Sequence, residues 1–186
     1  MNKTENLIFR AAIKSFSQKG YSKATMDEIS ETAGVAKGTL YYHFNSKEEI
    51  FNFIIDEGLK EIEDRVTEKT KHLDDPMEKL RAAFRVQLEL AIEYIDFFKT
   101  LFSQMWGDEE RHAQMRQVLM KYFSFFEGYM KAAVGEETLK KNNMEFVAYN
   151  FFGMVVSTVI YGMINEKRSI NELTEKLVEF LMKSIV

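Results

Sequence analysis

Residues 25–51 read TMDEISETAGVAKGTLYYHFNSKEEIF and contain two short amphipathic segments that meet at Gly34. A glycine at such a junction permits the tight turn that sets two helices at a steep angle, as in a helix-turn-helix. We predict one helix over about residues 26–33 and a second over about 36–43. The apolar residues expected to lock this pair together are Ile29, Ala33, Val35 and Leu40.

The outer surface of the second segment has side chains that suit DNA. The residues on or beside it are Lys37, Gly38, Thr39, Tyr41, Tyr42 and His43. A lysine can contact phosphate or guanine, a glycine lets the backbone come close, and hydroxyls can donate to phosphate oxygens. Thr25 and Lys47 flank the unit at helix N-termini, where free N–H groups attract phosphate. An ordinary three-helix subdomain with surface tyrosines is the alternative interpretation of the same residues.

The rest of the chain predicts more helices. One proline and 9 glycines among 186 residues leave few helix breakers. Residues Thr25, Ser46, Asp75 and Ser169 each stand three positions before a glutamate, the pattern of a capping box. Further helices are expected over about residues 3–19, 47–71, 76–98, 99–106, 109–133, 144–165 and 170–185. We therefore predict an all-α fold of about nine helices, with an N-terminal three-helix bundle that contains the helix-turn-helix.

The segment from Thr25 to Glu49 closely resembles the N-terminal signature of the TetR family of bacterial regulators. Residues 11–26, AAIKSFSQKGYSKATM, resemble the first helix and the following turn of that family. The resemblance implies a DNA-binding domain over residues 1–46 and a helical ligand-binding and dimerisation domain over residues 47–186. It also implies a homodimer that places one recognition helix of each subunit in successive major grooves of a near-palindromic operator.

The resemblance also assigns roles to single residues. Thr25 and Lys47 look like phosphate contacts, and Gly38 allows close approach to the DNA. The groove-facing set implied by the family is Lys37, Thr39, Tyr41, Tyr42 and His43. A regulator of this kind is expected to repress transcription until a small apolar or aromatic molecule releases it from its operator. A DNA-binding regulator without a sensor role is the alternative.

Charge and cysteine content are consistent with this class. Residues 1–47 hold seven basic and four acidic side chains, a net charge of +3, while the whole chain carries −4. A mildly basic head (residues 1–47) on an acidic body (residues 48–186) can bind DNA phosphates through the head alone. The chain has no cysteine, which excludes disulfides and thiolate metal sites. Its start carries charges throughout and does not have the pattern of a signal peptide, so we expect a cytoplasmic protein.

The last two predicted helices are candidates for the dimer interface. Residues 146–164 contain no charged side chain, which fits either a helix buried between two subunits or, less simply, a membrane span. The apolar face of the final helix consists of Ile170, Leu173, Leu177, Phe180, Leu181 and Ile185. Two helices from each subunit would form a four-helix bundle.

Aromatic residues and methionines are dense between the head and these helices. They predict a hydrophobic core, and together they also suit a pocket for an apolar ligand. The pocket candidates are Phe98, Phe102, Met105, Trp106, Met115, Leu119, Phe123, Phe126, Phe152 and Val156. A ligand that prefers one packing of this region could shift the helix that begins at residue 47 and so change the distance between the two heads.

An enzyme is the rival class. Glu109 and His112 have the spacing of half a carboxylate-bridged di-iron site, but the sequence holds no second copy of that motif. Phosphate-binding loops, nucleophile elbows and metal-ligand pairs are also missing from the sequence. We therefore expect no cofactor, no metal and no enzymatic activity, with a helical-bundle enzyme as the weaker alternative.

Overall fold

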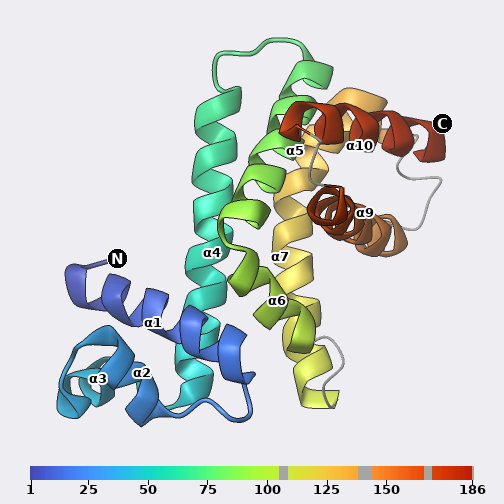
Figure 1. Ribbon diagram of the computed structural model, residues 1–186. Coiled ribbons are helices and arrows are strands. Elements are labelled where there is room, and N and C mark those ends of the chain that lie inside the picture. Colours follow the sequence, from blue (N-terminus) through green and yellow to red (C-terminus); the bar gives the residue numbers. More distant parts are fainter. Residues whose placement is uncertain (105–108, 138–143, 166–168, 186) are drawn as a thin grey trace. The chain divides into compact units, whose positions relative to one another are not determined.

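The computed structural model describes residues 1–104, 109–137, 144–165 and 169–185, and the regular elements in these ranges are α-helices (Figure 1). The helices are α1 (Lys3–Lys19), α2 (Met26–Ala33), α3 (Lys37–His43), α4 (Lys47–Thr70), α5 (Pro76–Glu93), α6 (Ile95–Gln104), α7 (Glu109–Val134), α9 (Met144–Ile164) and α10 (Ile170–Ile185). The predicted all-α fold is confirmed, and most helix ends lie within one residue of their predicted positions.

Side chains that the sequence singled out fix the starts of several helices. The Thr25 hydroxyl accepts from the backbone N–H of Glu28, and the Glu28 carboxylate accepts from the N–H of Thr25, both at 3.3 Å. The equivalent backbone hydrogen bond is accepted by Ser46, Asp75 and Ser169. Asn2 and Glu5 form a further complete capping box at the start of α1, which the sequence analysis did not identify. Each such cap contributes about 1 kcal/mol to helix stability.

The junction between two predicted helices is displaced. Helices are expected over residues 76–98 and 99–106, whereas α5 ends at Glu93 and α6 begins at Ile95. Neither glycine nor proline stands at this junction, so no local signal marks it. The cause lies in tertiary packing, because α5 packs against α9 and α10 while α6 packs against α1.

The helices form two compact units. The first unit comprises Met1–Lys60 and Tyr94–Met115, so it contains α1, α2, α3, the start of α4 and α6. Within it, α1 packs against α2 and α6, and α2 packs against α3. Aromatic rings fill its core, with the Phe51 ring centroid 6.0 Å from that of Phe16 and 5.1 Å from that of Tyr21. By these contacts the first unit extends beyond residue 46, where the sequence places the end of the DNA-binding domain.

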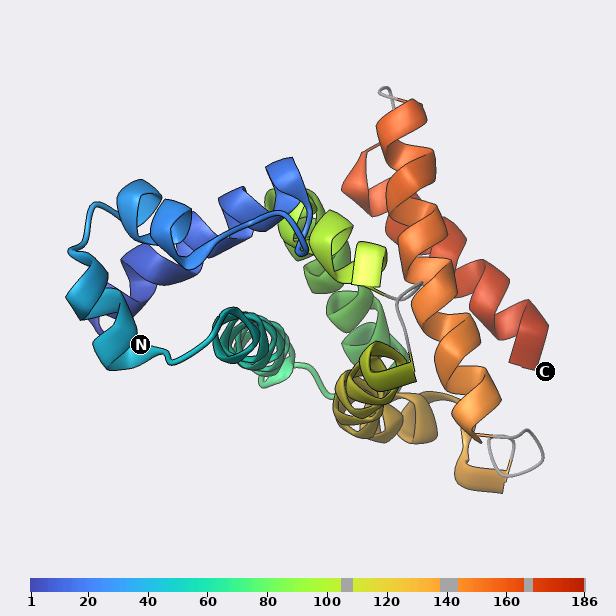
Figure 2. The ribbon, with the colours of Figure 1, turned by 90° about the horizontal axis from the view of Figure 1, so that it is seen from below.

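The second unit comprises Glu61–Glu93 and Arg116–Val186. Helix α5 packs against α9 and α10, which lie side by side (Figures 1 and 2). The fully buried side chains of the second unit include Leu80, Phe84, Leu88, Phe126 and Phe151. In the described ranges, no helix combines the length and the apolar character that a membrane crossing requires, α9 included.

Candidate DNA-reading surface and effector region

The turn between α2 and α3 has the geometry that its glycine predicts. Gly34 has φ +65° and ψ +31°, in the left-handed region that side chains with a Cβ atom disfavour. Its N–H donates to the carbonyl of Glu31, and the N–H of Val35 donates to the carbonyl of Ser30 at 3.1 Å. This hydrogen-bonded turn ends α2 and redirects the chain into α3. Val35 itself is half-buried, whereas the other predicted locking residues Ile29, Ala33 and Leu40 are buried.

Helix α3 fully buries one side chain, partly buries Thr39 and His43, and exposes its other residues. Leu40 is fully buried, while Tyr42 is 86% exposed and Tyr41 is 48% exposed. A Cβ atom added at Gly38 would meet no other atom within 4 Å, so the backbone there is open to approach. Thr39 is half-buried beside it. Two adjacent exposed tyrosines on a helix that follows a tight turn form a surface suited to contact with a partner.

Lys37, the first residue of α3, has an acidic partner. Its Nζ lies 2.6 Å from Oδ2 of Asp27 in the first turn of α2, and both side chains are more than half exposed. The hydrogen bond to this carboxylate raises the pKa of Lys37 above its ordinary value. The predicted cation is therefore present on the surface, but a carboxylate of the same protein already holds it.

His43 lies at the edge of this surface. Its side chain is mostly buried, its Nδ1 lies 4.0 Å from a carboxylate oxygen of Glu5, and its ring meets that of Tyr42 edge-on at 5.3 Å. Thr25 lies at the start of α2, where its hydroxyl caps the helix and keeps its own proton available as a donor. Of these two residues, His43 borders the tyrosine surface.

The Lys47 side chain occupies a different place from that expected of a phosphate contact. Its Nζ donates to the carbonyl oxygens of Tyr21 at 2.7 Å, Ser22 at 3.1 Å and Ala24 at 3.0 Å. It also lies 4.6 Å from the centroid of the Tyr21 ring. An ammonium group has three N–H donors, and these carbonyls use all three. Lys47 thus fastens the loop after α1 to the first turn of α4.

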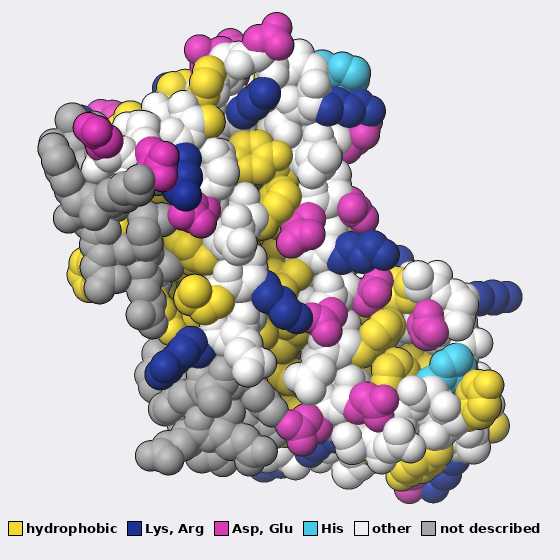
Figure 3. Space-filling model, turned by 180° about the vertical axis from the view of Figure 1, so that it is seen from behind, with side chains coloured by type: hydrophobic (Ala, Val, Ile, Leu, Met, Phe, Trp, Pro, Cys, Tyr) yellow, Lys and Arg dark blue, Asp and Glu magenta, His cyan; other side chains and the backbone are white. Residues whose placement is uncertain are grey.

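On the face shown in Figure 3, basic and acidic side chains are interspersed, and neither sign forms a continuous patch there.

The predicted pocket residues fall into three groups. Leu119, Phe123, Phe126 and Phe152 are buried in the second unit, and Val156 is half-buried there. Phe98 is half-buried in α6 of the first unit. Met105, Trp106 and the side chains of Phe102 and Met115 lie outside what the structure describes. Of these buried residues, Phe123, Phe126 and Phe152 share an aromatic cluster with Phe84, Tyr122 and Phe151.

A polar pair lies inside this aromatic cluster. The Tyr122 hydroxyl donates to Oε1 of Gln87, and both side chains are buried. Burial raises the pKa of Tyr122 above its ordinary value, so the phenol stays neutral. This pair was not predicted, although the helical spacing of Gln87 with the apolar Leu80, Phe84 and Ala91 was a signal that could have found it.

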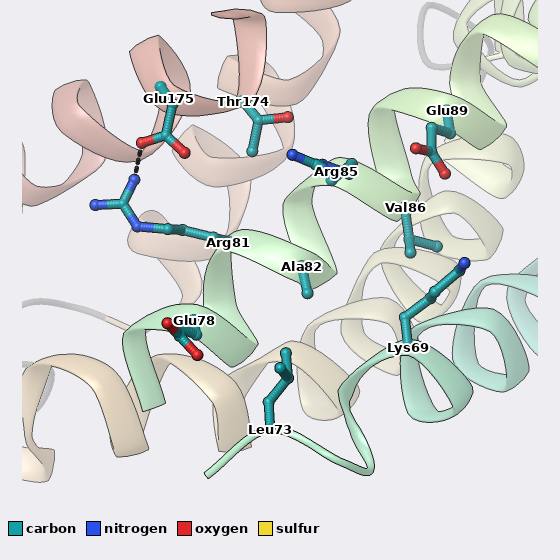
Figure 4. A pocket seen from close by; sticks show the side chains of 10 residues that line it. All are labelled: Lys69, Leu73, Glu78, Arg81, Ala82, Arg85, Val86, Glu89, Thr174 and Glu175. Atoms are coloured by element: carbon teal, nitrogen blue, oxygen red, sulfur yellow. Dashed lines mark hydrogen bonds and ion pairs between the residues drawn. The ribbon is translucent and has the colours of Figure 1, made fainter. Parts of the chain in front are cut away.

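A cavity of about 470 Å³ lies elsewhere in the second unit, between α4, α5 and α10 (Figure 4). Its lining residues are Lys69, Leu73, Glu78, Arg81, Ala82, Arg85, Val86, Glu89, Thr174 and Glu175. Arg81 forms an ion pair with Glu175, which ties α5 to α10, as the dashed line in Figure 4 marks. Acidic and basic side chains are balanced around a small apolar floor, so this cavity is distinct from the apolar effector pocket that the sequence predicts.

The di-iron alternative involves Glu109 and His112, whose side chains lie outside those that the structure describes. Among the residues that are described, no group of three histidine, aspartate or glutamate side chains is arranged to hold a metal ion.

The geometry of α2 and α3 defines a class: a helical protein with a helix-turn-helix whose second helix exposes residues suited to DNA. Comparison with known proteins agrees, because residues 8–54 match the family described as bacterial regulatory proteins of the tetR family. A solved structure from Clostridium perfringens, provisionally described as a fatty acid metabolism regulator, is 38% identical, with a TM-score of 0.80 and coverage of 97% of this chain and 98% of that one.

Two further likenesses come from Bacillus subtilis. The fatty acid metabolism regulator protein of strain 168 is 23% identical over 181 residues, which cover 96% of this chain and 93% of the relative. The structure of the regulator FadR in complex with stearoyl-CoA has a TM-score of 0.77 at 22% identity, over 95% of this chain and 96% of that one. The chain belongs to the TetR family, and it is a ligand-responsive, DNA-binding transcriptional repressor. The family and these relatives are regulators of transcription, not enzymes.

Proposed function

We propose that this protein represses transcription by placing α3 of each of two copies in the major groove of a near-palindromic operator, and that a molecule with a long acyl chain releases it. The observation that carries the DNA-binding part is Tyr42, which is 86% exposed on a short helix that begins directly after the left-handed turn at Gly34. A large aromatic side chain held in water at this position is best explained by a partner that covers it.

The proposal gives each surface residue a role. Lys37, Thr39, Tyr41 and Tyr42 contact base edges and nearby phosphates, and Gly38 lets the α3 backbone approach the DNA. Thr25 donates its hydroxyl to a phosphate, and His43 borders the contact. For Lys47 we propose a phosphate contact through the backbone N–H in the first turn of α4, because its ammonium group is held by three carbonyls.

Selection from random duplexes tests the DNA-binding part. The wild-type protein should enrich an inverted repeat, and the selected duplex then serves as the probe in fluorescence anisotropy. Tyr42→Ala combined with Lys37→Ala should abolish binding without changing the melting curve, because both side chains are exposed. Lys14→Ala, an equally exposed change on α1, is the matched control and should bind as the wild type does. Retained binding by the double variant would refute the assignment.

The effector part is supported by the apolar interior of the second unit and by the relatives. Leu119, Phe123, Phe126 and Phe152 supply buried apolar walls, which suit an acyl chain. Stearoyl-CoA should release the wild-type protein from its selected duplex, whereas coenzyme A alone should not. If stearoyl-CoA and stearate both leave the anisotropy unchanged, the acyl effector is wrong while the DNA-binding part stands.

We further propose a homodimer through α9 and α10. Apolar side chains lie exposed on both helices: Phe146, Tyr149, Ile160, Tyr161, Met163, Ile164 and Phe180. A groove of about 370 Å³ between the two helices has Phe180 on its wall and Leu173 and Leu177 beneath. An apolar surface of this extent indicates a protein partner, and a second copy fits the family.

Light scattering during gel filtration tests the dimer. Ile160→Asp combined with Phe180→Glu should convert the dimer into a monomer, because both changes place charge in the apolar interface. Lys183→Glu, on the exposed face of α10, should leave the dimer intact. A dimer that survives the double change would contradict the proposed interface.

We also propose that the protein acts by binding alone, without catalysis, in the cytoplasm.

A further inference from the structure

The ion pair between Asp27 and Lys37 is an unusual feature of a surface that reads DNA. The carboxylate belongs to the first turn of α2 and the ammonium group to the first residue of α3, so the bond spans the helix-turn-helix turn. The Nζ to Oδ2 distance is 2.6 Å, and the side chains are 65% and 58% exposed, respectively. A carboxylate is thus held beside the tyrosine surface, where a DNA phosphate would repel it.

The helix dipole explains why an acidic residue stands at position 27, but it does not explain why Asp27 bonds to Lys37. An acidic residue in the first turn of a helix is stabilised by the helix dipole. Glu28 next to it is already the glutamate of the capping box and pairs with Lys19 at 2.5 Å. Asp27 does not cap α2 in this structure, since the backbone N–H of Glu28 is capped by Thr25. Its bond to Lys37 is therefore additional to the requirements of the helix.

We infer that Asp27 acts as an intramolecular stand-in for phosphate, which holds Lys37 in the unbound protein and gives it up only to DNA that binds more strongly. The inference rests on the proposed role of α3 in reading DNA. A carboxylate and a phosphate offer the lysine the same kind of contact, an anionic oxygen at hydrogen-bond distance. Random DNA then gains little from Lys37, because Lys37 stays with Asp27.

This exchange has a measurable consequence for salt dependence. Each lysine that neutralises a DNA phosphate steepens the slope of log affinity against log salt by about 0.9. On mixed-sequence DNA the wild-type Lys37 stays with Asp27, so it neutralises no phosphate and releases no cation from the DNA. Asp27→Asn removes the competing anion and makes Lys37 available to a phosphate. We therefore expect its slope on mixed-sequence duplex DNA to be steeper than that of the wild type by about one unit.

The affinity should change in the same direction. An exposed ion pair stabilises by at most about 1 kcal/mol, which corresponds to a factor of about five in binding. Asp27→Asn should accordingly bind mixed-sequence DNA about two- to fivefold more tightly at low salt. Glu31→Gln is the matched control, because Glu31 lies on the same helix, is exposed and contributes to the electrostatics of Lys37 without a hydrogen bond to it. Its effect should be smaller.

A double-mutant cycle decides the matter. Anisotropy titrations with a mixed-sequence duplex, between about 50 and 200 mM salt, would compare Asp27→Asn in the wild-type background and in a Lys37→Met background. The gain should vanish when Lys37 is absent. An equal gain in both backgrounds would show that Asp27 acts only as bulk negative charge, and weaker binding by Asp27→Asn would show that it positions Lys37; either result overturns the inference. If Lys37→Met alone leaves binding of the selected operator duplex unchanged, the proposed role of Lys37 on α3 fails instead.

Discussion

Replacing Lys47 by methionine separates a structural role of this side chain from a role in binding phosphate. The ammonium group donates to the carbonyls of Tyr21, Ser22 and Ala24, at distances between 2.7 and 3.1 Å. Methionine keeps much of the aliphatic stem and removes the charge and the three donors. The change therefore leaves three carbonyls of the loop after α1 without their common donor, two of them in partly buried hydrogen bonds.

The size of the effect follows from these contacts. A hydrogen bond to a charged group contributes about 1.5–3 kcal/mol, but partial solvent access and the recovered hydration of the ammonium group lower the total. We expect Lys47→Met to lower the free energy of unfolding by about 2–4 kcal/mol in total. For a chain of this length that loss corresponds to a fall in Tm of about 5–10 °C.

Circular dichroism melting at one fixed protein concentration measures the change, since association would otherwise alter Tm. Lys37→Met is the matched control: it is the same substitution in the same head, at a lysine that is 65% exposed and bound to one carboxylate. It should melt within about 1 °C of the wild type, because exposed ion pairs stabilise little. Equal melting of the two variants would refute the reasoning, and so would a Lys47→Met variant of wild-type stability that no longer binds DNA.

Three further outcomes are expected from urea unfolding. Gly34→Val should cost about 1–2 kcal/mol because φ is +65°, whereas Gly34→Asn should cost less; equal losses would contradict the strain argument. Tyr122→Phe should lower the free energy of unfolding by about 1–3 kcal/mol, because it leaves the buried Oε1 of Gln87 without its donor. Adding Gln87→Leu should recover part of that loss. Strictly additive effects of the two changes would contradict this prediction. Arg65→Met should lower the free energy of unfolding by less than about 1 kcal/mol, and by less still at high salt, because the ion pair with Glu93 is half-exposed. A loss that does not depend on salt would show that Arg65 stabilises through packing and not through the ion pair.

Helix ends were predictable where the signal is local. The cap at Thr25 and the glycine at position 34 lie within the segment they control, and the structure places α2 over the predicted residues. The break at Tyr94 was not predictable in this way. Its cause is the packing of α6 on α1, and the two partners are about eighty residues apart in the chain. A periodic apolar pattern that continues across such a junction does not mark its position, so the break was predicted after Phe98 whereas it lies at Tyr94.

The same distinction applies to the candidate site. Exposure of Tyr41 and Tyr42 followed from the positions of the buried residues on a single short helix. The partners of Lys47 could not be predicted in this way, because the carbonyls it binds lie 23 to 26 residues earlier and carbonyl oxygens have no signature in a sequence. The pair of Gln87 and Tyr122 joins two helices 35 residues apart, which pattern analysis of either helix alone would miss.

The division of the chain into units bears on how an effector in the body could act on the head. The sequence analysis assigned this task to the helix beginning at Lys47, which does pass from the first unit to the second. In the structure α6 also belongs to the first unit, where it packs against α1 and where Phe97 lies so close to Gly58 that an added Cβ would be 3.0 Å from the ring. Since α6 follows α5 directly in the chain, we expect a ligand that changes the packing of α5 to act on the first unit through α6 as well as through α4. It can shift the equilibrium only by its difference in affinity for the two packings.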